Sequence, residues 1–88
     1  MPKQGVEVKA KVYVEVMALH KRDGTVEPMF VVYTDGRCFR VDRVLDVRRA
    51  TAYHTGAVGL RYHVQIESKR TFLYRDGNRW FVEATVRQ

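Results

Sequence analysis

The stretch VEVKAKVYVEVMAL, residues 6–19, decides the fold class. Small or β-branched side chains occupy every second position, namely Val6, Val8, Ala10, Val12, Val14, Val16 and Ala18. An apolar repeat of period two, rich in β-branched residues, indicates a strand that is buried on one face. At about 3.3 Å per residue the stretch would span roughly 46 Å, which is long for a small domain. We therefore expect this strand to bend, to carry a bulge near Ala10, or to project beyond the body of the protein.

Turn signals divide the next part of the chain into hairpins. The dipeptides Asp23-Gly24 and Asp35-Gly36 are typical of hairpin loops, because glycine tolerates a positive φ. Between them, the continuous apolar run at 29–33 indicates a strand covered on both faces. Pro28 lacks an N–H group, so we expect it at the start of that strand or on an edge.

The last third of the chain predicts three more strands. They cover residues 60–66, 71–75 and 79–86, and a turn at 68–70 joins the first two. A three-residue loop at Asp76-Gly77-Asn78 would place Phe72 and Tyr74 opposite Val82 and Trp80 on one apolar face. Residues 50–59, with two glycines near their end, are expected to form the longest loop.

Residues 37–49 give the most ambiguous pattern. Phe39, Val41, Leu45 and Val47 alternate, but Val44 breaks the phase. We expect a bulge or bend near residues 42–43. A short helical turn is the alternative, because Val41, Val44, Leu45 and Arg48 also have helical spacing.

The pattern as a whole predicts an all-β protein. Its 88 residues leave room for one small domain, with an ordered core over about 6–86. Five or six sequential antiparallel strands would form a single small barrel or a strongly bent sheet, SH3-like or OB-like. Closure of that kind removes strand edges that invite aggregation.

The charge is divided unevenly along the chain. The net charge is +6, yet residues 1–36 are neutral, with five basic and five acidic groups. Residues 37–88 carry eleven basic groups against five acids, and ten of the eleven are arginine. Arginine presents a planar fork that suits phosphates and carboxylates. This asymmetry points to an anionic partner, either a nucleic acid or an acidic protein.

No catalytic or metal-binding pattern is present. The single cysteine, Cys38, excludes an internal disulfide and a multi-cysteine zinc site. His20, His54 and His63 are not spaced as metal ligands, and Asp42 and Asp46 lie among arginines, which favours surface ion pairs. We expect a protein that is not an enzyme and has no cofactor. With no apolar run of membrane-spanning length and no signal peptide, we expect it in the cytoplasm, without membrane contact.

Two surfaces are candidates for binding. The first is basic and aromatic, and comprises Arg61, His63, Arg70, Arg75, Arg79, Phe81 and Tyr53. By strand phase, Tyr62, Trp80 and Phe72 point inward, while Phe81 and Tyr53 point outward. Small barrels stack the bases of single strands on such rings inside a positive groove. The alternative is a solvated basic face over an aromatic core.

The second candidate is the back face of the first hairpin, formed by Met17, Leu19, Phe30 and Val32. If these side chains are exposed together, they would suit a partner protein or a second copy, giving a monomer or a weak homodimer. If the first strand curls around a barrel, they are core instead. The two functional hypotheses are thus a binding module for an anionic partner and a protein-interaction or self-assembly domain.

Three segments carry a resemblance: VDRVLDVR at 41–48, GLRY at 59–62 and RWFVE at 79–83. They resemble segments of short uncharacterised bacterial all-β proteins, over roughly residues 30–83. The resemblance implies a compact β domain, and it assigns no catalytic residue and no substrate.

Overall fold

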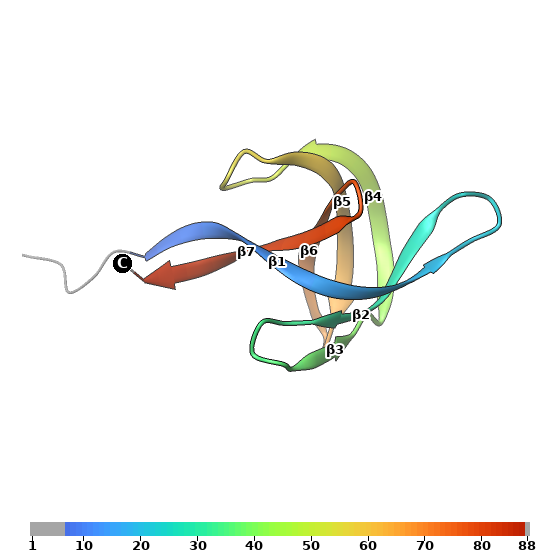
Figure 1. Cartoon of the computed structure of the whole chain (residues 1–88), viewed down its shortest axis with the longest axis horizontal. Coiled ribbons are helices and arrows are strands. Elements are labelled where there is room, and N and C mark those ends of the chain that lie inside the picture. Colours follow the sequence, from blue (N-terminus) through green and yellow to red (C-terminus); the bar gives the residue numbers. More distant parts are fainter. Residues whose placement is uncertain (1–6, 88) are drawn as a thin grey trace, which may run out of the picture.

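The computed structural model describes residues 7–87, and every regular element in them is a β-strand (Figure 1). The strands are β1 (Glu7–His20), β2 (Val26–Val32), β3 (Cys38–Arg40), β4 (Arg43–Thr51), β5 (Val58–Ile66), β6 (Lys69–Asp76) and β7 (Arg79–Arg87). All neighbouring strands are antiparallel. The predicted all-β, antiparallel class is confirmed, but the expected count of five or six strands is wrong. Val6 lies outside the described residues.

The count rises to seven because residues 37–49 divide into two strands. The chain leaves β3 at Val41 and Asp42 and re-enters the sheet as β4, so the bend predicted near residues 42–43 is confirmed. No helical turn forms there. The phase break at Val44 has a separate cause, a bulge between Val44 and Asp46 opposite β5.

The seven strands form one sheet in the order β3-β2-β1-β7-β6-β5-β4. The two edge strands, β3 and β4, follow each other in the chain with only two residues between them. The sheet must therefore curl strongly, into a half-barrel whose edges meet at this link (Figure 1). Backbone hydrogen bonds join this link to β2 and to β5. The Val41 N–H donates to the Met29 carbonyl at 2.9 Å, and the Asp42 N–H donates to the Gln65 carbonyl at 2.8 Å.

The long first strand is shared between two partners. Its residues 7–14 pair with β7, and its residues 15–20 pair with β2. Ala10 pairs regularly with Ala84, so the expected bulge near Ala10 is wrong. The irregularity falls between Met17 and Ala18, where Met29 is the extra residue of β2 beside Pro28, which cannot donate to the ladder.

The expectation that the first strand would project is confirmed. The start of β1 and the end of β7 leave the body together as a two-stranded ribbon (Figure 1), and the protein measures 56 × 25 × 21 Å.

The core has two layers, one on each face of the sheet. The concave inner face holds the main cluster, Val31, Val41, Tyr62, Val64, Leu73 and Trp80. The outer face holds a smaller cluster of Ala52, Tyr74 and Phe81, which is flanked by Tyr13, Ala57 and Phe72. The inward positions expected for Tyr62 and Trp80 are confirmed. Phe72 lies instead on the outer face, half-buried.

The last hairpin turns more tightly than expected. Asp76 pairs with Arg79, so the turn contains only Gly77 and Asn78, and Gly77 adopts a φ of 61°. Glycine at the first central position is typical of a type II′ turn. Tyr74 therefore lies opposite Phe81, and the expected three-residue loop is wrong.

Candidate nucleic-acid interface

The outer face of the sheet gathers basic side chains from both halves of the sequence. Within residues 8–85, strand pairing and alternation bring seven cations of β1 and of β4–β7 to this face: Lys9, Lys11, Arg43, Arg48, Arg61, Arg70 and Arg79. The carboxylates that the same strands bring to this face are Glu15, Asp46, Asp76 and Glu83. The surface is thus basic, although the sequence alone assigned the surplus only to residues after 36.

A ladder of cations and aromatic rings runs across β5 and β6 on this face. The guanidinium carbon of Arg61 lies 4.5 Å from the ring centroid of Tyr53 and 5.1 Å from that of Phe72. His63 stacks on Phe72 with centroids 4.9 Å apart. Arg61 pairs with no carboxylate among the described residues. These four residues, the aromatic ladder, therefore present flat surfaces and uncompensated positive charge together.

The loop that carries Tyr53 is fixed by a distant carboxylate. Glu83 Oε2 accepts hydrogen bonds from the backbone N–H groups of His54 and Thr55, at 2.9 and 2.6 Å. Partial burial acts to raise the pKa of Glu83, but these N–H donors outweigh it and hold the pKa below its ordinary value. The loop is thereby folded over the outer cluster, while Tyr53 stays 61% exposed.

The candidate residues from the sequence do not all share one surface. Tyr53, Arg61, His63 and Arg70 come together on the outer face, so the outward position expected for Tyr53 is confirmed. Arg79 lies at another part of that face, with its guanidinium carbon 3.5 Å from the centroid of the Tyr13 ring.

Phe81 and Arg75 depart from the expected surface. Phe81 is fully buried, because Tyr74 stacks on its ring at 5.1 Å and the 52–57 loop covers this part of the outer face. Strand phase placed Phe81 on the correct side of the sheet, but the expectation that its ring is available to a partner was wrong. Arg75 lies opposite Trp80, toward the concave side, with its guanidinium carbon 5.7 Å from that ring.

Sequence reasoning missed three contributors to the outer face: Phe72, Glu83 and Lys11. The Nζ of Lys11 lies 5.0 Å from the Tyr13 centroid and 5.1 Å from the Phe81 centroid. The alternation of residues 6–19 placed Lys11 on the polar phase of the first strand, but only the pairing of β1 with β7 brings it to this surface.

The two aspartates expected in surface ion pairs, Asp42 and Asp46, differ in their contacts. Asp46 pairs with Arg48 at 2.7 Å, as expected of a surface ion pair, and the hydrogen bond from Arg48 lowers the Asp46 pKa. Asp42 instead accepts a hydrogen bond from the Glu67 N–H at 3.1 Å. Residues 7–87 hold no cluster of three or more potential metal-ligating side chains. They also hold no helix with the length and apolarity to cross a bilayer.

The apolar face of the first hairpin is exposed. Met17 is 61% and Leu19 50% exposed, and Met17 lies opposite the half-buried Phe30. Val32 is also half-buried, and the bulge adds Met29 at the surface. Of the two alternatives for this face, exposure together fits these positions and incorporation in the core does not.

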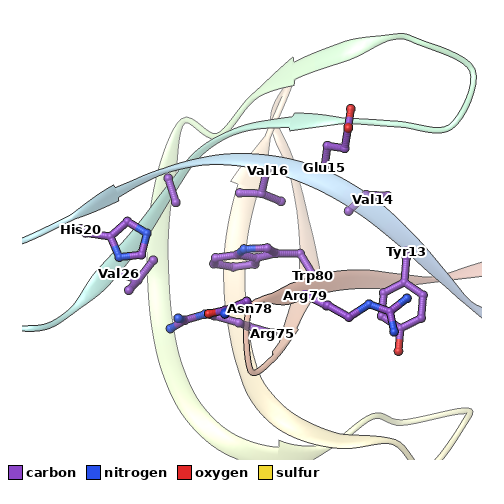
Figure 2. A pocket seen from close by; sticks show the side chains of 11 residues that line it. Tyr13, Val14, Glu15, Val16, His20, Val26, Arg75, Asn78, Arg79 and Trp80 are labelled. Atoms are coloured by element: carbon purple, nitrogen blue, oxygen red, sulfur yellow. The ribbon is translucent and has the colours of Figure 1, made fainter.

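A cavity of about 550 Å³ lies on the concave side, between β1, the start of β2 and the β6–β7 turn (Figure 2). Trp80 lies at its centre, and Arg75 and Asn78 lie beside that ring. No residue of the aromatic ladder lines the cavity, although Tyr13 and Arg79 of the outer face reach its lining.

Comparison of the chain with known protein families, with curated proteins and with solved structures gives no match. No SH3-like or OB-like structure therefore matches this half-barrel. The resemblance to short bacterial proteins stays a prediction.

Proposed function

We propose that the protein is a non-enzymatic binding module that holds a single-stranded nucleic acid on the outer face of its half-barrel. The observation that carries the proposal is the aromatic ladder, in which Arg61 lies over two rings and pairs with no described carboxylate. Aromatic rings and arginine planes stack on bases, and basic side chains neutralise phosphates. This face offers both within one continuous surface.

The aromatic ladder would act mainly through stacking. Tyr53, on its loop, is 61% exposed and would offer a base the part of its ring that Arg61 and Phe72 leave uncovered. The exposed Arg70 follows on β6 and would contact the phosphates, together with Arg61. Small barrels of the SH3-like or OB-like kind bind single strands on one sheet face in this manner, and we extend that comparison to this half-barrel as part of the proposal.

Binding is tested with a fluorescently labelled, mixed-sequence single-stranded oligonucleotide across a salt series. We expect affinity to fall linearly on logarithmic axes, with a slope of about −0.7 for each phosphate neutralised. Tyr53→Ala removes one stacking platform and should weaken binding by about 1–3 kcal/mol, roughly 5- to 150-fold. Arg61→Gln should weaken binding and also make the salt slope shallower.

Arg22→Gln is the matched control. Arg22 is an exposed arginine in the β1–β2 turn and lies outside the outer-face set, so its loss should leave the affinity nearly unchanged. Absence of binding at low salt, or an equal loss for Arg22→Gln and Arg61→Gln, would reject the proposal. Circular dichroism of each variant checks that the fold is retained.

A second candidate function is protein interaction or self-assembly through the apolar face of the first hairpin. It rests on the exposure of Met17 and Leu19 beside Phe30. Met17→Asp keeps the buried side of the hairpin intact and puts a charge on this face. Sedimentation should then give a smaller species for Met17→Asp than for the wild type. A monomeric wild type argues against self-assembly.

A further inference from the structure

The cavity on the concave side is lined by apolar and polar side chains in nearly equal measure. Val14, Val16 and Ala18 of β1 and Val26 of β2 form one wall, and Trp80 forms the floor (Figure 2). Its volume of about 550 Å³ falls within the range of small-molecule sites, roughly 300–1,000 Å³. The main core, including Tyr62 against Trp80, is already packed beneath it.

The charged groups at this cavity favour an anion, because Arg75 and Arg79 outnumber the single carboxylate. Arg75 is half-buried and lies in no ion pair among the described residues. His20 and Asn78 also line the cavity and add nitrogen donors from two other places in the chain. The one carboxylate of the lining is Glu15, which Figure 2 shows at the margin, with its side chain directed away from Trp80.

We propose that this cavity binds a free aromatic anion of about the size of a mononucleotide. An apolar wall beside Trp80 suits a flat ring, and the guanidinium of Arg75 offers a planar fork for a phosphate or carboxylate. Arg79 also lines the cavity, but its guanidinium lies over Tyr13 (Figure 2). The site is therefore assigned to Arg75, with His20 and Asn78 beside it.

The site does not rest on the proposed nucleic-acid function, because its lining includes no residue of the aromatic ladder. Variants can therefore separate the two. Arg75→Gln should weaken binding of the small anion and leave oligonucleotide binding unchanged, whereas Arg61→Gln should do the reverse.

Trp80 is the only tryptophan of the chain and provides a built-in reporter. Adenosine 5′-monophosphate is the probe, titrated against the wild-type protein with excitation selective for tryptophan. We expect a saturable change in fluorescence, and binding that is about tenfold weaker or more in Arg75→Gln. The wild-type protein should bind adenosine, which lacks the phosphate, more weakly than adenosine 5′-monophosphate by a similar factor.

A second readout is needed because Arg75→Gln changes the surroundings of Trp80 and can alter its fluorescence without any change in binding. Methyl NMR signals of Val14 and Val16 should shift with the probe in the wild type and in Arg61→Gln. No saturable change at millimolar probe in either readout would overturn the proposal. Equal binding by the wild type and Arg75→Gln would overturn it as well.

Discussion

At the residue scale, one carboxylate organises much of the candidate interface. Glu83 accepts two N–H groups from a loop that is 28 and 29 residues earlier in the chain. That contact holds the 52–57 loop over Tyr74 and Phe81, and it positions Tyr53 at the surface. A polar side chain on a strand is thus needed both for the outer cluster and for the ring that is proposed to stack on a base.

Glu83 also gives a pH-dependent prediction. Its pKa is lowered in the folded state from an ordinary value of 4.5, so the unfolded chain binds the proton more readily. The stabilisation is present above about pH 4.5 and is lost as the pH falls through the folded-state pKa. Because the group is only partly buried, solvent screening limits the effect of Glu83→Gln to about 0.5–1 kcal/mol of unfolding free energy at neutral pH.

Urea unfolding of the wild type and of Glu83→Gln at pH 7 and pH 3 measures this effect. The difference between the two proteins should shrink at pH 3. Other acids with lowered pKa values, such as Asp46, are common to both proteins and cancel in the comparison. An equal difference at both pH values would contradict the assignment.

At the scale of elements, the sequence predicted strands better than it predicted how they join. Period-two alternation over residues 6–19 and 60–66 corresponds to β1 and β5, because each has one face on the main core. The pattern could not show that β1 changes partner between Val14 and Glu15, since its alternation continues through that point. It also could not separate the three-residue edge strand β3 from β4, because β3 is too short for a periodic signal.

Strand periodicity was also insufficient to predict which residues of the candidate site are exposed. Strand phase on its own put Phe81 on an outward face, and this was correct as to the side of the sheet. Its burial depends on the 52–57 loop, which has no periodic pattern and is fixed by a long-range contact to Glu83. The local sequence around Phe81 could not predict that a distant loop packs over its ring.

The β5–β6 turn gives an element-scale prediction. Glu67 and Ser68 adopt φ values of 50° and 67°, the geometry of a type I′ turn, in which glycine or asparagine is favoured. Ser68→Gly should relieve part of the cost of about 1–2 kcal/mol that a left-handed conformation imposes on an L-residue. We expect a gain of about 0.5–1 kcal/mol in unfolding free energy.

Thermal or urea unfolding measures this gain. Ser68→Ala is the matched control, since alanine also removes the hydroxyl but keeps the Cβ atom. Stabilisation of both variants to the same extent would show that the backbone conformation is not the cause.

At the scale of the whole molecule, the curl of the sheet creates two unlike faces. The concave side buries the main core and carries the Trp80 cavity, while the outer side carries the aromatic ladder and the seven cations of β1 and of β4–β7. The charge asymmetry along the sequence only partly predicted this. Lys9 and Lys11, from the neutral part of the chain, reach the outer face because β1 pairs with β7.

The most direct test of the central claim is a map of backbone amide NMR shifts during titration with a single-stranded oligonucleotide. The largest shifts should cluster at Tyr53, Arg61, His63 and Arg70 on the outer face, and they should diminish as salt is raised. Shifts centred instead on Met17 and Leu19, or the absence of any saturable shift at low salt, would contradict a nucleic-acid interface on this face.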